Sequence, residues 1–133
     1  MTPTLNVLLV EDCEDDAWMI LREFKKNGLP VNGERVQSSA GLNDALNRKT
    51  WDIVVSDYRM PHFSGMTALA IVRVHSAVLP FILLSGVVEE RVAKVAIMTG
   101  ATAFLEKANI GQLISTIRRE VKRAAELSGG SPH

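Results

Sequence analysis

The chain has 133 residues, of which 47% are hydrophobic and 23% charged, a composition typical of one soluble globular domain that buries its own core. Its 15 basic residues balance 15 acidic ones, and this zero net charge argues against broad electrostatic attraction to nucleic acid or an anionic membrane. Cys13 is the only cysteine, which excludes an internal disulfide and a zinc site built from cysteines.

We expect a single domain over residues 1–133, with a core of about 5–127 and a flexible tail at 128–133. No apolar run reaches membrane-spanning length, and the first residues lack the pattern of a signal peptide. We therefore expect a cytoplasmic protein that does not contact the membrane. The sequence leaves open whether the domain stands alone or belongs to a larger hybrid kinase.

Short apolar segments rich in Val, Ile and Leu predict strands that are buried on both faces. Three such segments are LNVLLV (5–10), DIVVSD (52–57) and LPFILLS (79–85). Two further segments, ERVQSS (34–39) and ATAFLEK (101–107), are more polar or weaker. We expect these two to form the edges of the same sheet.

Between and after these strands, apolar residues recur every three or four positions, which predicts five amphipathic helices. The predicted helices are marked by Ala17, Ile20, Leu21 and Phe24; by Leu42, Ala45 and Leu46; by residues 65–75; by Val88, Val92, Val95, Ala96 and Thr99; and by Ile110, Leu113, Ile114, Ile117, Val121 and Ala124. Gly28 and Gly100 are expected to end the first and fourth helices.

The regular alternation of strand and helix predicts an α/β fold with a doubly wound, five-stranded parallel sheet. Its crossovers should be right-handed, with helices on both faces of the sheet. Two polar edges and three apolar centres fit the flavodoxin-like strand order 2-1-3-4-5.

Polar residues end or follow four of the predicted strands. Glu11 and Asp12 follow the first strand, and Asp57, Ser85 and Lys107 end the third, fourth and fifth. In doubly wound sheets ligands bind at the carboxyl ends of the strands, near the point where the strand order reverses. These residues come from distant parts of the chain, so their convergence on one edge is more specific than any one of them.

Three carboxylates at one edge repel one another, by about 4 kcal/mol for a pair 4 Å apart at an effective dielectric near 20. A divalent cation removes this penalty, and oxygen ligands favour Mg²⁺, Mn²⁺ or Ca²⁺ over zinc. A carboxylate also acts as a nucleophile toward phosphorus, and Asp57 is the best placed to form an aspartyl phosphate. The Lys107 ammonium and the Ser85 hydroxyl would then bind phosphoryl oxygens.

Each of these residues also has a simpler interpretation. Asp15 and Asp16 suit the first turn of a helix, where acidic side chains face the positive end of the helix dipole. Asp57 could belong to a turn, Ser85 could open a loop, and Lys107 could be a solvated lysine at the sheet edge. None of these interpretations explains why such residues end neighbouring strands of one predicted sheet, so we favour the phosphoryl-transfer site.

Four segments resemble, in order and spacing, those of the response-regulator receiver domains of bacterial two-component signalling. They are LLVEDCEDD, DIVVSDYRMPHFSG, FILLSG and GATAFLEKANI, and the resemblance covers about residues 5–127. It implies that Asp57 is the phosphorylated residue. It also implies that Mg²⁺ is bound by Glu11, Asp12, Asp57 and the backbone carbonyl of Arg59, with Asp12 as a direct ligand.

The same resemblance assigns Ser85 as the switch hydroxyl, Lys107 as the lysine that pairs with the phosphoryl group, and Phe104 as the switch aromatic. Gly65 belongs to the turn that follows the phosphorylated residue. The family usually has proline directly after the lysine, whereas this chain has Ala108. We expect the Lys107–Ala108 peptide to be trans, because a cis bond before a residue other than proline costs about 2.5–4 kcal/mol. Asn109 would then cap the last helix.

The implied function is a phosphorylation switch in a two-component system or phosphorelay. With Mg²⁺, Asp57 would accept a phosphoryl group from a sensor histidine kinase, or from a kinase domain of the same polypeptide. The face formed by the fourth helix, fifth strand and fifth helix would then change its affinity for a downstream protein. Such a domain catalyses only its own phosphorylation and dephosphorylation, so we expect no enzyme, no direct contact with nucleic acid, and a monomer or weak dimer.

Three other functions are compatible with this fold class. A Mg²⁺-dependent phosphatase would need a second acid two residues after Asp57, where the chain has Arg59. A flavin or dinucleotide binder would be expected to carry G-x-G-x-x-G after the first strand, and this motif is missing there. A receiver domain that acts only as a scaffold would not need the complete set of site residues.

Overall fold

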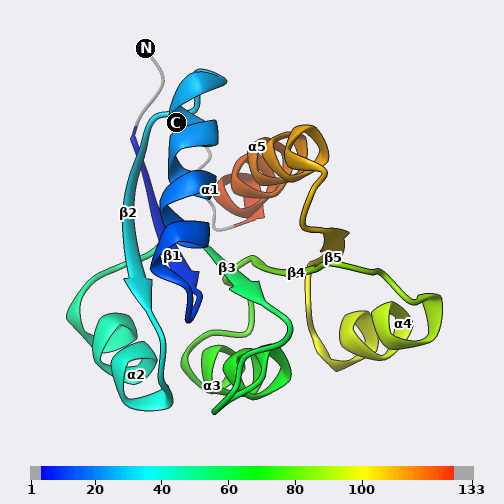
Figure 1. The fold of residues 1–133 in the computed structure, drawn as a ribbon. Coiled ribbons are helices and arrows are strands. Elements are labelled where there is room, and N and C mark those ends of the chain that lie inside the picture. Colours follow the sequence, from blue (N-terminus) through cyan, green and yellow to red (C-terminus); the bar gives the residue numbers. More distant parts are fainter. Residues whose placement is uncertain (1–3, 128–133) are drawn as a thin grey trace.

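Five parallel strands alternate with five helices in the computed structural model, which describes residues 4–127 (Figure 1). The strands are β1 (Leu5–Val10), β2 (Val31–Val36), β3 (Ile53–Asp57), β4 (Phe81–Ser85) and β5 (Ala103–Glu106). The helices are α1 (Glu14–Lys26), α2 (Ser39–Arg48), α3 (Gly65–His75), α4 (Glu90–Thr99) and α5 (Ile110–Leu127). The strand order β2-β1-β3-β4-β5 confirms the predicted doubly wound sheet.

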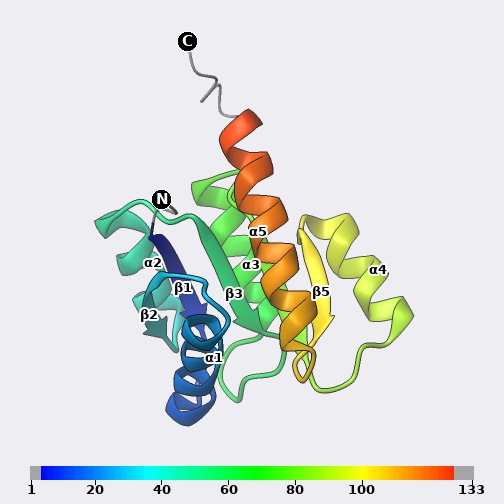
Figure 2. The ribbon, with the colours of Figure 1, turned by 90° about the horizontal axis from the view of Figure 1, so that it is seen from above.

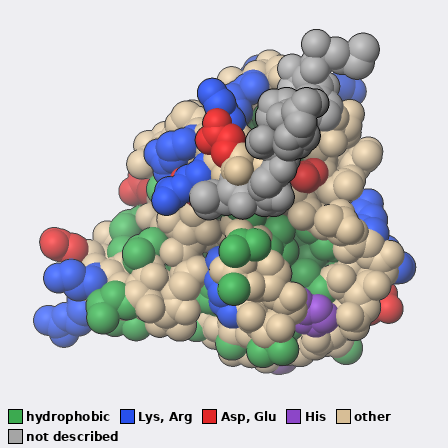
Figure 3. All heavy atoms as spheres, turned by 180° about the vertical axis from the view of Figure 1, so that it is seen from behind, with side chains coloured by type: hydrophobic (Ala, Val, Ile, Leu, Met, Phe, Trp, Pro, Cys, Tyr) green, Lys and Arg blue, Asp and Glu red, His purple; other side chains and the backbone are tan. Residues whose placement is uncertain are grey.

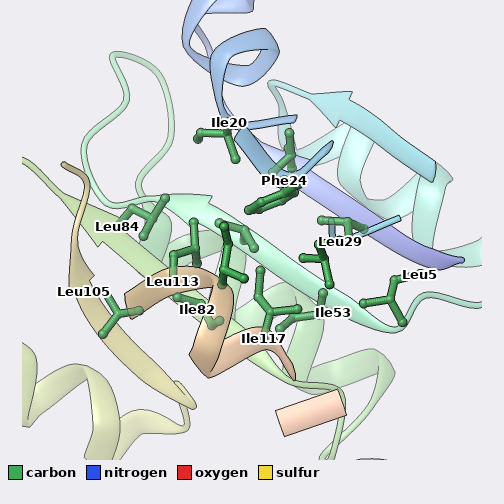
Figure 4. Close-up of a cluster of buried hydrophobic side chains, with 14 of the residues drawn as sticks. Leu5, Ile20, Phe24, Leu29, Ile53, Ile82, Leu84, Leu105, Leu113 and Ile117 are labelled. Carbon is green, nitrogen blue, oxygen red and sulfur yellow. The ribbon is translucent and has the colours of Figure 1, made fainter. Parts of the chain in front are cut away.

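Helices cover both faces of the sheet, with α1 and α5 on one face and α2, α3 and α4 on the other (Figures 1 and 2). The strands supply both cores because successive side chains of a strand point to opposite faces. On β1, for example, Val7 and Leu9 pack beneath α1 and α5, while Leu8 and Val10 pack against the other helices. Figure 4 shows the first of these cores, in which Phe24 is fully buried.

The edge strand β2 starts and ends three residues earlier than the predicted segment 34–39. It pairs with β1 from Leu5 opposite Val31 to Val10 opposite Val36, so its length follows that of β1. Ser38, which the prediction placed in the strand, instead caps α2, since its hydroxyl accepts a hydrogen bond from the Gly41 N–H. Pairing and capping therefore override the weak strand pattern of this segment.

The other edge of the sheet also differs from the prediction. Strand β5 is shorter than the predicted 101–107, so Lys107 lies one residue beyond its end. Of the five residues expected to line the fourth helix, Ala96 alone is buried, Val95 is 53% exposed, and Val88 precedes the helix. The reason is the position of α4 beside β5, where the sheet ends and only a narrow strip of apolar surface can be covered.

The loop that leads from β5 to α5 has the geometry expected from its sequence. The Lys107–Ala108 peptide is trans, and the Asn109 side chain accepts a hydrogen bond from the Gln112 N–H at 3.1 Å, as an N-cap does. The expected tail at residues 128–133 lies outside the described residues. Within residues 4–127, no helix has both the length and the apolarity needed to cross a membrane.

Candidate functional site

Three carboxylates converge at the carboxyl ends of β1 and β3. One oxygen from each of Glu11, Asp12 and Asp57 lies within 4.8 Å of the other two, and we call these three residues the acidic trio. Glu11 is buried and Asp57 partly buried, whereas Asp12 is exposed at the mouth of the site. The trio forms because β1 and β3 are neighbours, with Val10 opposite Ser56, so both strands end at the same level.

Lys107 reaches this trio from the loop after β5. Its ammonium nitrogen lies 3.1 Å from Glu11 Oε1, 3.1 Å from Asp16 Oδ2 and 3.5 Å from Asp57 Oδ2. Its backbone N–H donates to the carbonyl of Ser85 at 2.8 Å, which fixes the start of the side chain beside β4. A lysine ammonium has three N–H groups, and here carboxylates from three different residues lie within 3.5 Å of its nitrogen.

Asp16 was not among the site residues suggested by the sequence, where it was interpreted as a favourable charge in the first turn of α1. That interpretation holds, since Asp16 does lie in the first turn. Asp12, four residues earlier, lies before the N-cap Cys13 and outside α1, so helical spacing does not link the two residues. Spacing alone could not show that Lys107 would reach it from a loop 91 residues away.

Burial controls the protonation of the site. It raises the pKa of Glu11 to about 7, although the hydrogen bond from Lys107 acts in the opposite direction. Burial likewise raises the pKa of Asp57, against the attraction of the Lys107 charge. For Lys107, burial opposes the charged form, but the hydrogen bonds to Glu11 and Asp16 outweigh it and raise the pKa. Lys107 therefore stays protonated, and the Glu11 carboxyl holds its proton to a higher pH than an ordinary glutamate does.

Backbone contacts hold the two acidic segments in place. Arg35 on β2 donates from Nη1 to the Glu11 carbonyl at 3.2 Å, and the Cys13 N–H donates to Glu11 Oε2 at 3.3 Å. Beside Asp57, the Tyr58 N–H donates to the Leu84 carbonyl at 2.8 Å. No sequence pattern pointed to Arg35, because a single arginine on an edge strand is a common surface residue.

The remaining residues suggested by the sequence lie around this centre. Ser85 ends β4 and is buried, and Arg59, two residues after Asp57, is exposed. Phe104 on β5 is 8% exposed and packs against Tyr58, with the ring centroids 5.2 Å apart. Phe104 is thus buried, and Tyr58 is a contact that the sequence did not indicate.

Comparison with known proteins places this geometry in a family. Residues 7–118 match the family model described as the response regulator receiver domain. The chain belongs to this receiver-domain family. Members act in two-component signal transduction, where the general role of the domain is that of a phosphoacceptor switch.

Curated relatives and solved structures agree with this assignment. The chain is 35% identical over 124 residues to the C4-dicarboxylate transport transcriptional regulatory protein DctD of Pseudomonas aeruginosa, with 89% of this chain and 26% of that protein covered. It is 26% identical over 121 residues to the DNA-binding transcriptional regulator NtrC of Escherichia coli, with 90% and 25% covered. The receiver domain of the Francisella response regulator 1452 superposes with a TM-score of 0.79 at 25% identity, covering 90% of this chain and 98% of that one. The chain thus spans about a quarter of the length of the curated relatives it matches.

Proposed function

We propose that Asp57 accepts a phosphoryl group from the phosphohistidine of a sensor histidine kinase, and that this changes the affinity of the domain for a downstream protein. The observation that carries the proposal is the position of Asp57 beside two kinds of group. Glu11 and Asp12 each have a carboxylate oxygen within 4.8 Å of one of its own, and the Lys107 ammonium lies 3.5 Å from Asp57 Oδ2. A nucleophilic carboxylate, metal-binding oxygens and a fixed cation are the groups that phosphoryl transfer to an aspartate requires.

The transfer is a displacement at phosphorus. An Asp57 carboxylate oxygen forms the new P–O bond while the P–N bond to the kinase histidine breaks, and the electron pair of that bond stays with the departing imidazole nitrogen. Lys107 remains protonated throughout and binds a phosphoryl oxygen as a point charge. The buried Ser85 hydroxyl, at the end of the neighbouring strand, donates a hydrogen bond to another phosphoryl oxygen.

The acidic trio fits Mg²⁺ because it offers only oxygen atoms, from three carboxylates within 4.8 Å of one another. Glu11, Asp12, Asp57 and the carbonyl of Arg59 would hold the ion. When bound, Mg²⁺ offsets the repulsion between these carboxylates and the incoming phosphoryl oxygens. A solved structure supports this choice of metal by analogy: the receiver domain of the sensor histidine kinase PA1611 from P. aeruginosa, 20% identical with a TM-score of 0.76, has a magnesium ion coordinated in its active-site cleft.

The proposed output surface is the face formed by α4, β5 and α5. Helix α4 exposes Val95, Ile97 and Met98, and Met98 is 80% exposed. Hydrophobic side chains are visible beside charged ones of both signs on the side of the molecule where α4 lies (left in Figure 3). Phe104 links this face to the site, because it lies on β5 and contacts Tyr58, the neighbour of Asp57. Displacement of Phe104 after phosphorylation would change the surface presented by α4 and β5.

In this role the chain is a signalling domain and not an enzyme with a turnover substrate. Phosphorylation and dephosphorylation occur on its own Asp57, and the kinase donates the phosphoryl group in the cytoplasm. Binding to DNA, as the names of the NtrC relatives state for those proteins, would need residues beyond the receiver domain. A rival function, a phosphatase with Asp57 as nucleophile, uses the same chemistry but predicts multiple turnovers.

The proposal is tested by incubating the protein with acetyl phosphate and Mg²⁺ and measuring its intact mass. We expect one added phosphoryl group, which Asp57→Asn and excess chelator both abolish. Asp15→Asn is a matched control, because it makes the same chemical change at an exposed residue outside the acidic trio. Labelling that persists in Asp57→Asn would contradict the proposal. Sustained hydrolysis of a phosphomonoester by the wild type would favour the phosphatase instead.

A further inference from the structure

Lys107 has three carboxylate partners, and they differ in their relation to the acidic trio. Glu11 and Asp57 belong both to the trio and to the contacts of Lys107. Asp16 contacts Lys107 at 3.1 Å but is not a member of the trio. Among these partners, Asp16 is thus the one whose charge a metal ion in the trio would not share.

We propose that Asp16 is a positioning residue that holds the Lys107 ammonium beside Asp57 while Mg²⁺ occupies the acidic trio. This inference rests on the proposed function and adds a residue to it. The role needs no contact between Asp16 and the phosphoryl group, because Asp16 acts through Lys107.

The electrostatic reason is the competition between two cations for the same carboxylates. Mg²⁺ in the trio draws on Glu11 and Asp57, and its double charge repels an ammonium a few ångströms away. Without another partner, the flexible side chain of Lys107 would turn toward water, where its charge is well solvated. Asp16 opposes this movement, since its carboxylate keeps a full charge for Lys107. Its side chain is 44% exposed, so the ion pair is modest in strength and can adjust when a phosphoryl group arrives.

The contact also joins two separate parts of the fold. Asp16 lies in the first turn of α1, and Lys107 lies in the loop between β5 and α5. Ala108 gives this loop more conformational freedom than the proline that is usual in the family would. The ion pair and the Lys107 N–H bond to Ser85 therefore restrain the loop in place of proline.

The test compares Asp16→Asn with Asp15→Asn, which removes the same charge from the neighbouring, exposed residue that does not contact Lys107. The first measurement is nitrogen-15 NMR of the Lys107 ammonium in Mg²⁺-saturated protein, without a phosphodonor. We expect its protons to exchange with water at least severalfold faster in Asp16→Asn than in the wild type or Asp15→Asn. Asp16→Glu, which keeps the charge, should restore slow exchange in part.

The second measurement is the initial rate of phosphorylation by acetyl phosphate at saturating Mg²⁺. We expect Asp16→Asn to be about three- to fivefold slower than Asp15→Asn, the range set by a half-exposed ion pair. In a Lys107→Met background the two variants should have equal rates, because Asp16 acts through Lys107. Unchanged ammonium exchange, or a rate that rises in Asp16→Asn, would overturn the inference. Failure of the wild type to be labelled at all would instead refute the proposed function, while the NMR result would still decide the role of Asp16.

Discussion

Gly65 is expected to allow close packing against the segment that carries Asp57, and Gly65→Ala tests this. Gly65 is the first residue of α3, and its N–H donates to the Tyr58 carbonyl at 2.9 Å. A Cβ at this position would lie 2.6 Å from the Asp57 carbonyl oxygen, 2.9 Å from Tyr58 Cα and 2.5 Å from Leu83 Cδ2. Ordinary contacts begin at 3.4 Å, so each neighbour must move by roughly 0.5 to 0.9 Å.

The Leu83 side chain can rotate, but the two backbone atoms cannot move freely. The Asp57 carbonyl accepts a hydrogen bond from Ser56 Oγ at 2.9 Å, and the Tyr58 N–H is bonded to β4. Overpacking of this kind destabilises a protein by about 1–3 kcal/mol, and the higher helix propensity of alanine returns at most about 1 kcal/mol. We therefore expect Gly65→Ala to lose about 1–2 kcal/mol of the free energy of unfolding.

The assay is urea unfolding at constant pH, followed by circular dichroism, with Gly111→Ala as the matched control. Gly111 also lies in the first turn of a helix, but a Cβ there would meet only Asn109 Oδ1 at 3.9 Å. This control should gain about 0.5–1 kcal/mol. Because the movement displaces Asp57, Gly65→Ala should also be phosphorylated more slowly than Gly111→Ala. Equal stability of the two variants would refute the steric argument.

Three further predictions concern the charged groups and the phosphorylated state. In chelator, the free energy of unfolding should fall by about 2–3 kcal/mol between pH 4.5 and pH 7, because the folded protein keeps a proton on Glu11 that the unfolded chain has released. Urea titrations at several pH values measure this fall, and Glu11→Gln should remove most of it. Arg73→Met should lower the free energy of unfolding by about 1–3 kcal/mol in the same assay, since the half-buried guanidinium donates to the carbonyls of Gly100, Ser76 and Leu79. Unchanged stability would show that water satisfies these carbonyls equally well. Phosphorylated protein that has been freed of phosphodonor should lose its phosphoryl group slowly. Arg59 stands two residues after Asp57, and Val87 two residues after Ser85, and neither supplies an acid or amide to orient water. A phosphoryl lifetime of seconds, measured by intact mass, would contradict this.

The sequence alone was sufficient for the strand order and for the convergence of the acidic trio and Lys107 at one edge of the sheet. The strands alternate between two cores, as Val7 and Leu8 do on β1, and this burial on both faces appears in the sequence as continuous apolar runs. The proximity of Asp57 and Lys107 was also predictable, because residues at the carboxyl ends of parallel strands, or directly after them, lie at the same edge of the sheet. Such features depend on periodicity and on chain order, which the sequence records directly.

Other features were decided only by the tertiary structure. The bounds of β2 depend on its pairing with β1, and the exposure of Val95 depends on how little surface the sheet edge offers to α4. The contacts of Asp16 with Lys107 and of Arg35 with the Glu11 carbonyl join side chains from elements far apart in the chain. Long polar side chains have several rotamers that reach different partners, so local sequence cannot specify the partner. The relative positions of α1, β2 and the β5–α5 loop, set by packing on the sheet, bring these groups within hydrogen-bonding distance.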